Sequence, residues 1–364
     1  MRLSPARALL STASAPFQHR MSVPGARPTT LARVIAFFHR HPVLLLLAFT
    51  PGIPEYLSGS TAVYPIVTVP VLFLLFLGLN LGLYGPGVLL VREAFVRWRK
   101  GFGWATLLVL GAAYGLLEEG TALSTLFDPN ASVVGGLGHY GHAYGVSWVW
   151  LIGIVLVHTV LSVGLPIVLL GLALPETRGR PLLSSRGIGA AAAIYAADIV
   201  LLALISNYWR VAGALLLLAA LAALLLWLVA WRLPAGFLDP PNERPRASPR
   251  VAFLLGLAYF PVLLIVPGLF GDLRQPAILA GLVDLVLAGA LFFGARAAVG
   301  RRGNRAQMVA LALGVLIPIA LFGLFAQIFL PLVLVVDVLF ALFFRTLWVR
   351  YRPRPAPPVG ATGA

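Results

Sequence analysis

Apolar runs of about twenty residues recur along this 364-residue chain, and they constrain its fold more than any other feature. A bilayer core about 30 Å thick needs roughly 20 apolar residues in a helix, because each residue adds about 1.5 Å. The chain is 60% hydrophobic and only 11% charged, whereas soluble domains carry about 25% charged residues. The sequence therefore predicts an all-α, polytopic integral membrane protein.

The positions of the basic residues indicate how often the chain crosses the membrane. We expect about ten spans, because the arginines gather in every second loop and the opposite loops hold only Arg210 and Arg274. Cytoplasmic loops are enriched in Arg and Lys, so both termini are predicted to be cytoplasmic. The Arg-rich composition is typical of GC-rich genomes and favours the plasma membrane of a prokaryote. The expected spans are residues 41–60, 62–83, 104–127, 147–174, 187–206, 211–231, 251–270, 276–297, 308–328 and 330–348.

The chain divides into five parts at the boundaries of these runs. Residues 1–40 are basic and lack Asp and Glu, and residues 349–364 are rich in proline, so both are predicted to be disordered tails. A six-helix block over 41–231 and a four-helix block over 251–348 flank a proline-rich cytoplasmic linker, 232–250. The polar residues of interest all lie in the first block.

Two segments of the first block interrupt the pattern of spans. Tyr84-Gly85-Pro86-Gly87 predicts the end of the second span, and an amphipathic interfacial helix with Arg92 and Glu93 is expected after it. The loop 128–145 is the longest outer loop, and its four glycines predict a flexible lid rather than a metal site at His139 and His142.

Glu118 and Glu119 lie inside the third apolar run, where each carboxylate costs roughly 2.5–3.5 kcal/mol to insert. Counting at about 1.5 Å per residue places the pair at nearly the same depth as His158 and Asp198 on the following spans. These four residues are predicted to form one polar layer. Glu55, near the outer end of the first span, is expected at the interface.

Helical spacing adds supporting residues to this layer. Tyr114 and Thr121 share a helix face with Glu118, as does Thr125, and Ser162 lies one turn from His158. Two adjacent carboxylates resist ionising together in a low dielectric, which suits a general base or a proton carrier. Catalysis is therefore assigned to Glu118, Glu119 and His158, with support from Asp198, Tyr114, Thr121 and Ser162.

The Glu-Glu pair and the later histidine resemble motifs of the CAAX-protease and bacteriocin-processing superfamily of intramembrane proteases. That family carries Glu-Glu-x-x-x-Arg on one helix, Phe-x-x-x-His on the next and a third His motif further on. Here Leu123 stands at the Arg position and Ile154 at the Phe position, and no histidine follows His158. The resemblance implies that Glu118 is the general base for a water, with Glu119 and His158 as partners.

Three functions follow from these patterns as alternatives. The first is an intramembrane peptidase, glutamic or dependent on a divalent metal such as zinc, with His158 and Glu119 as the first candidate ligands. The second is a transporter of protons or a small solute, and the third is a non-catalytic membrane scaffold. The expected partners are the lipid bilayer and a membrane-embedded peptide or small solute. Nucleic acid is excluded, because no basic patch is interleaved with exposed aromatic residues.

Overall fold

The computed structural model describes residues 30–60, 69–98, 103–301, 305–326 and 331–352, and nearly all of them are helical. Several helices contain a π-helical or 3-10 segment (η). The elements are α1 (Thr30–Arg40), α2 (Pro42–Pro51), η3 (Gly52–Leu57), α3 (Pro70–Arg97), α4 (Trp104–Gly115), η6 (Leu116–Ala122), η7 (Gly135–Gly138), β1 (His142–Ala143), β2 (Val146–Ser147), α5 (Trp148–Val157), η8 (His158–Gly164), α6 (Leu165–Ala173), η9 (Pro175–Thr177), α7 (Ser185–Ser206), α8 (Trp209–Arg232), α9 (Pro249–Leu257), η10 (Pro261–Ile265), α10 (Val266–Asp272), α11 (Ala277–Val299), α12 (Arg305–Ala326) and α13 (Leu332–Tyr351).

The chain forms two units, residues 1–41 and residues 42–364. In the first unit, residues 30–40 of the expected basic tail form α1, and residues 1–29 lie outside the described residues. The second unit contains α2 to α13 and the polar residues predicted from the sequence. Helix α13 ends at Tyr351, and residues 353–364, most of the proline-rich tail, lie outside the described residues.

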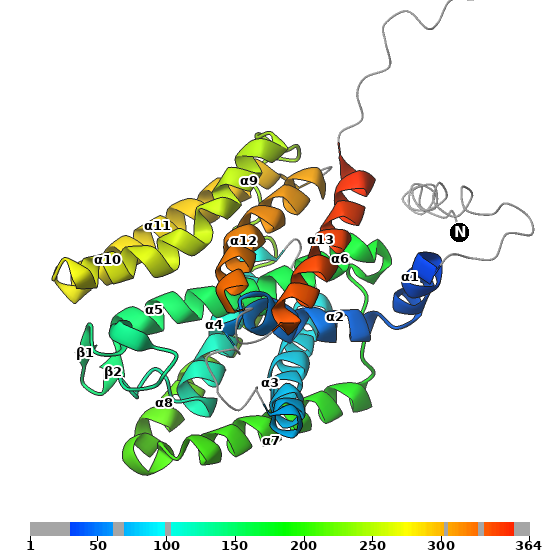
Figure 1. The fold of residues 1–364 in the computed structure, drawn as a ribbon. Coiled ribbons are helices and arrows are strands. Elements are labelled where there is room, and N and C mark those ends of the chain that lie inside the picture. The colour runs from blue at the N-terminus through cyan, green and yellow to red at the C-terminus, as the bar shows by residue number, and fades with distance from the viewer. Residues whose placement is uncertain (1–29, 61–68, 99–102, 302–304, 327–330, 353–364) are drawn as a thin grey trace, which may run out of the picture. The chain divides into compact units, whose positions relative to one another are not determined.

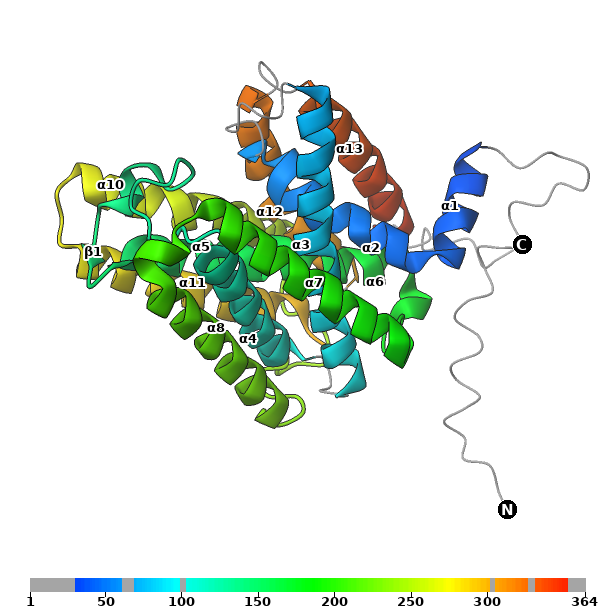
Figure 2. The same cartoon turned by 90° about the horizontal axis from the view of Figure 1, so that it is seen from below.

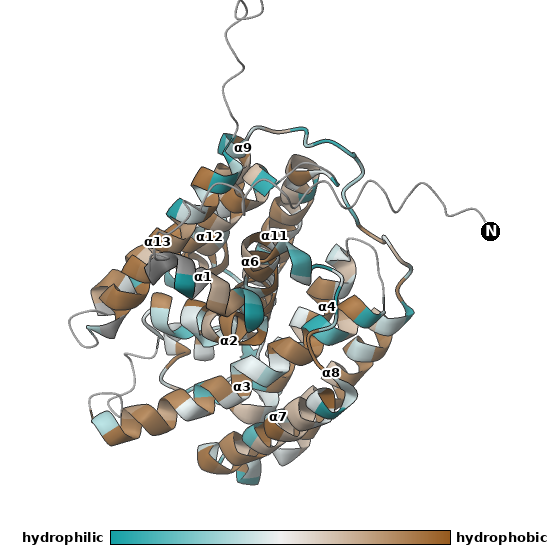
Figure 3. Cartoon of the chain, turned by 90° about the vertical axis from the view of Figure 1, so that its right-hand side faces the viewer, coloured by the Kyte–Doolittle hydropathy of each residue, from teal (hydrophilic) through white to brown (hydrophobic). Residues whose placement is uncertain are grey.

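Seven helices in the described part of the chain are long and apolar enough to cross a membrane. They are Pro70–Arg97, Trp148–Ala173, Ser185–Ser206, Trp209–Arg232, Pro249–Asp272, Ala277–Val299 and Arg305–Phe325. Their lipid-facing sides carry exposed apolar residues such as Leu204 on α7 and Leu217 on α8, and Figure 3 shows the apolar residues along the helices. The multi-pass helical architecture agrees with the sequence, while the count of ten and the cytoplasmic termini stay predictions.

Loops that are distant in the sequence contact one another near the ends of the helices. At one end Tyr140 donates to the carbonyl of Gln275 at 2.9 Å, near the β1–β2 hairpin and α10 (Figure 1). At the other end Asp239 accepts from the backbone N–H of Gly103 at 2.8 Å. The outer loop is also more ordered than its glycines suggest. Tyr144 and Gly145 have φ of 55° and 77°, the two positive values that a tight type I′ hairpin turn needs.

Helix α3 overturns the expected break at Tyr84–Gly87. It continues through Pro86 to Arg97, and it packs against both α2 and α7 (Figure 2). Arg92 and Glu93 are therefore not interfacial but buried, at 3% and 1% exposure. Arg92 donates to Glu93 at 3.0 Å and to the carbonyl of Thr177 at 2.6 Å, so the pair ties α3 to the loop after α6. This satisfied ion pair makes burial of both charges tolerable.

Four segments of the described chain have π geometry. They are η3 after α2, η6 after α4, η8 between α5 and α6, and η10 between α9 and α10. Hydrogen bonding at η6 shows the change, because Leu123 N–H donates to the carbonyl of Glu118 five residues earlier, at 2.8 Å. Such segments are rare and occur frequently at functional sites. The first three carry ionisable residues, whereas η10 carries none.

Candidate functional site

Glu118 and Glu119 lie on η6, and His158 is the first residue of η8. Close packing of the two helices brings them together, because α4 has Gly115 where the helices meet. A Cβ at Gly115 would lie only 3.2 Å from the Cβ of His158 and 3.3 Å from the Cα of Val155. All three side chains are buried, with exposures of 0% for Glu118, 5% for Glu119 and 4% for His158.

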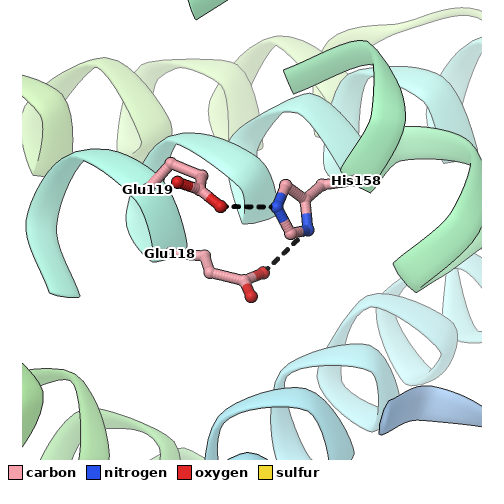
Figure 4. Close-up of side chains that lie close together, drawn as sticks. All are labelled: Glu118, Glu119 and His158. Carbon is pink, nitrogen blue, oxygen red and sulfur yellow. Dashed lines mark hydrogen bonds and ion pairs between the residues drawn. The ribbon is translucent and has the colours of Figure 1, made fainter. Parts of the chain in front are cut away.

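The imidazole of His158 bridges the two carboxylates, as Figure 4 shows. Its Nδ1 lies 3.0 Å from Oε2 of Glu118, and its Nε2 lies 2.7 Å from Oε1 of Glu119. Nδ1 is also 2.8 Å from Oγ of Ser162, one turn further along η8. We call Glu118, Glu119 and His158 the Glu-His-Glu cluster. The structure thus brings together the three residues that the sequence singled out, together with Ser162.

The hydrogen count in this cluster has a chemical consequence. A neutral imidazole has one N–H donor and one acceptor nitrogen, whereas both ring nitrogens here face a carboxylate oxygen. The cluster therefore needs a second proton, either on the imidazole or on one carboxyl group. A second proton that can lie on any of three buried groups is the arrangement expected of a site that accepts and releases protons.

Glu119 is the more firmly held of the two carboxylates. The hydroxyl of Thr125 donates to its carboxylate, and Trp150 Nε1 donates to the hydroxyl oxygen of Thr125 at 3.2 Å. This contact departs from the predicted helix face, on which Thr125 stands with Glu118. The helix ends at Ala122, and Ser124 has a φ of 62°, so the chain turns and brings Thr125 back onto Glu119.

The carboxylate of Glu118 makes fewer polar contacts than that of Glu119. Within the described residues neither of its carboxylate oxygens makes a hydrogen bond, so the ion pair with His158 is its recorded polar contact. Tyr84 from α3 and Tyr114 from α4 approach it, and both rings lie near His158, with centroids 6.4 Å and 6.2 Å away. The hydroxyl of Tyr114 is buried and has no hydrogen-bond partner in the described chain. Glu118 therefore has lone pairs available for a proton from a bound molecule.

Two other predicted supporting residues lie away from the Glu-His-Glu cluster. The hydroxyl of Thr121 donates to the carbonyl of Leu216 at 3.2 Å and so contacts α8. Asp198 lies on α7 against Gly82 of α3, where a Cβ would be 2.9 Å from its Oδ1. In the described chain Asp198 makes no ion pair with His158, so it is not part of the cluster.

Glu55 and Tyr84 extend the polar region beyond what the sequence indicated. Tyr84 donates to Oε1 of Glu55 at 2.6 Å, and Ser60 donates to its Oε2 at 2.9 Å. Glu55 lies on η3 and is half-buried rather than fully interfacial. Pro51 and Pro54 could have indicated that α2 is interrupted at this depth. Because the sequence predicts a helix break at Tyr84, it does not indicate that the side chain of Tyr84 lies near the cluster.

The donor set also fits a divalent cation. One oxygen from each glutamate and one nitrogen of His158 lie within 4.8 Å of one another. Carboxylate oxygen and imidazole nitrogen are both zinc ligands, and three protein ligands leave one position open, as in catalytic zinc sites. In the loop 128–145, His139 and His142 contact different partners, Asn130 and Ser147.

A profile described as "uncharacterized membrane protein family" matches residues 44–349 of the chain. This match covers all of the spans and the Glu-His-Glu cluster. No curated protein and no solved structure matches the chain.

Proposed function

Since the chain belongs to this family of uncharacterised membrane proteins, we propose that its Glu-His-Glu cluster is an intramembrane acid–base centre. Peptide-bond hydrolysis in a membrane-embedded substrate is the reaction that it supports best. One observation carries the proposal: a buried imidazole has a carboxylate on each ring nitrogen, at 3.0 Å and 2.7 Å. The plasma membrane of a prokaryote, crossed about ten times, is part of the same proposal.

The different surroundings of the two glutamates suggest different roles. Glu119 positions the imidazole, because Thr125 and Trp150 fix its carboxylate. Glu118 acts as the general base, because its oxygens have no hydrogen bond in the described chain. It takes one proton from a water molecule while the water oxygen bonds to the carbonyl carbon of the substrate. The same proton then passes to the amine nitrogen as the C–N bond breaks.

Tyr114 is placed to assist this reaction. Its buried hydroxyl lacks a partner among the described residues, so it has a proton to donate to the carbonyl oxygen as negative charge develops there. A divalent cation such as zinc would be held by Glu118, Glu119 and His158, and when bound it would lower the energy needed to deprotonate water. The roles of Thr125, Trp150 and Ser162 in holding these residues are the same in either case.

The test is cleavage of a library of transmembrane peptides by the purified protein in nanodiscs, with products identified by mass spectrometry. Glu118→Gln is expected to abolish cleavage, because an amide cannot accept the proton. Asp284→Asn is the matched control, since Asp284 is also buried at 0% exposure, and it should retain activity. Undiminished cleavage by Glu118→Gln would end the proposal. A zinc chelator distinguishes the two forms of the site, because only a metal-dependent peptidase loses activity.

Proton-coupled transport is the second candidate, and Asp284 is the observation that favours it. Both of its carboxylate oxygens are buried and lack partners in the described chain, as does Oδ2 of Asp198. Unpaired carboxylates within membrane helices are typical of proton pathways. Proteoliposomes with a pH gradient test this alternative. Flux that requires both Glu118 and Asp284 would favour transport over hydrolysis, whereas sealed vesicles would exclude it.

A further inference from the structure

A large cavity lies on the opposite side of α5 and η8 from the Glu-His-Glu cluster. Its volume is about 1130 Å³, above the roughly 300–1,000 Å³ of pockets for drug-sized ligands. The walls come from α3, α4, α5, η8, α6, α8, α9, α11 and α12, and they are mainly aliphatic and aromatic. Such a cavity suits the hydrocarbon chains of a lipid.

The cavity is separate from the proposed catalytic site. Thr159 lines the cavity, whereas His158 beside it points to the glutamates. Between them α4 packs on η8 at Gly111, where a Cβ would lie 2.9 Å from the Cα of Thr159. The hydroxyl of Thr159 is satisfied by the carbonyl of Val155 at 2.7 Å. Backbone contact thus separates the cavity from the Glu-His-Glu cluster. Binding of a ligand in the cavity therefore does not depend on hydrolysis at the cluster.

One end of the cavity is basic. Arg92 and Arg178 line it, near the loop after α6 that is predicted to be cytoplasmic. Arg92 is satisfied by Glu93 and by two carbonyls. Arg178 uses only Nε, which donates to the carbonyl of Gly171 at 2.7 Å, and its terminal nitrogens have no acceptor among the described residues.

A second cation reinforces this end. Desolvation at the cavity mouth and the neighbouring Arg305 guanidinium both lower the pKa of Arg178, although the side chain remains exposed overall. Two guanidinium groups that repel each other beside an apolar cavity are complementary to an anion attached to a hydrocarbon chain. Phosphate is the anion for which the planar guanidinium fork is best suited.

We propose that this cavity binds an anionic phospholipid, with an acyl chain in the cavity and the phosphate at Arg178. The cytoplasmic leaflet is a source of such lipids, because its anionic head groups lie at the depth of the positive loops. A zwitterionic lipid has the same chains but carries a cationic group that the two arginines repel. The site is therefore expected to distinguish lipids by head group.

The test is a lipid titration of the purified full-length protein in detergent, read by native mass spectrometry and by the melting temperature. Phosphatidylglycerol should bind and raise the melting temperature, whereas phosphatidylcholine and inorganic phosphate should not. Arg178→Gln should weaken phosphatidylglycerol binding about tenfold, since it removes a charge-assisted hydrogen bond. Arg180→Gln, an exposed arginine of the same loop outside the cavity lining, is the matched control.

A second variant tests the cavity itself. Gly289 lines it, and a Cβ there would meet nothing within 4 Å, so Gly289→Phe fills the cavity without a backbone clash. It should abolish binding, whereas Gly268→Phe, which is equally open but outside the cavity, should not. Equal binding of both lipids, or equal binding by wild type, Arg178→Gln and Gly289→Phe, would overturn the proposal. A response to inorganic phosphate alone would assign the basic end to a soluble anion.

Discussion

Replacing His158 tests whether the imidazole is what makes two buried carboxylates tolerable. In the described chain each glutamate has an ion pair with His158, at 3.0 Å and 2.7 Å, and with no other cation. His158→Leu removes both contacts and leaves two carboxylates unpaired in a low dielectric. Breaking a buried ion pair by removing one partner costs about 3–5 kcal/mol. We expect at least that loss in the free energy of unfolding.

The coupling energy between Glu118 and His158 can be measured by making Glu118→Gln both in the wild-type protein and in the His158→Leu protein. In the wild-type protein it should cost about 1–3 kcal/mol, because the buried imidazole loses the charged partner of its 3.0 Å contact. In the His158→Leu protein it removes an uncompensated charge, so it should increase stability. The effects have opposite signs, and the coupling energy therefore exceeds the roughly 0.3–0.5 kcal/mol within which independent sites are additive.

Equilibrium unfolding in detergent, followed by the fluorescence of the eight tryptophans, measures these differences. Asp284→Asn is the control, because Asp284 is buried on α11 and has no recorded contact with His158, so its effect should be the same in both backgrounds. If Glu118→Gln lowers stability by the same amount with and without His158, the bridging imidazole does not govern the cluster.

Two further predictions follow from the same contacts and from the loops. Thr125→Val should cost about 1–3 kcal/mol of unfolding free energy and reduce activity, because Glu119 loses a donor, whereas Thr121→Val should leave activity intact. The chain has no cysteine, so single cysteines report topology directly. An impermeant maleimide should label Gly136→Cys in intact cells and Arg186→Cys only after lysis, and the reverse pattern would contradict the predicted orientation.

The sequence predicted the members of the Glu-His-Glu cluster because buried charge is expensive and therefore conspicuous. Glu118, Glu119 and His158 stand out in runs of apolar residues, and helix rise places them at one depth. The same argument includes Asp198, which lies outside the cluster, so equal depth does not by itself establish contact. Glu55 and Tyr84 did not stand out. Pro51 and Pro54 precede Glu55, and a Gly-Pro-Gly string follows Tyr84, so both sequences indicate helix ends. Packing of α3 against α2 and α7 keeps α3 helical through Pro86, and tertiary packing is not visible in one sequence.

The π segments explain why the finer geometry departs from helical spacing. A π turn adds a residue, so side chains after it are rotated relative to an α-helix with the same residues. At η6 this change precedes the left-handed Ser124, and Thr125 contacts Glu119 instead of standing with Glu118. The same interruption occurs at η3 and η8, where Glu55 and His158 lie. Three of the four π segments in the described chain coincide with ionisable residues, and the fourth, η10, is wholly apolar. Because irregular backbone within a membrane is tolerated only where protein or a water-filled cavity compensates it, these segments depend on the buried contacts around them, which at η6 and η8 include the pairing of Glu119 with His158.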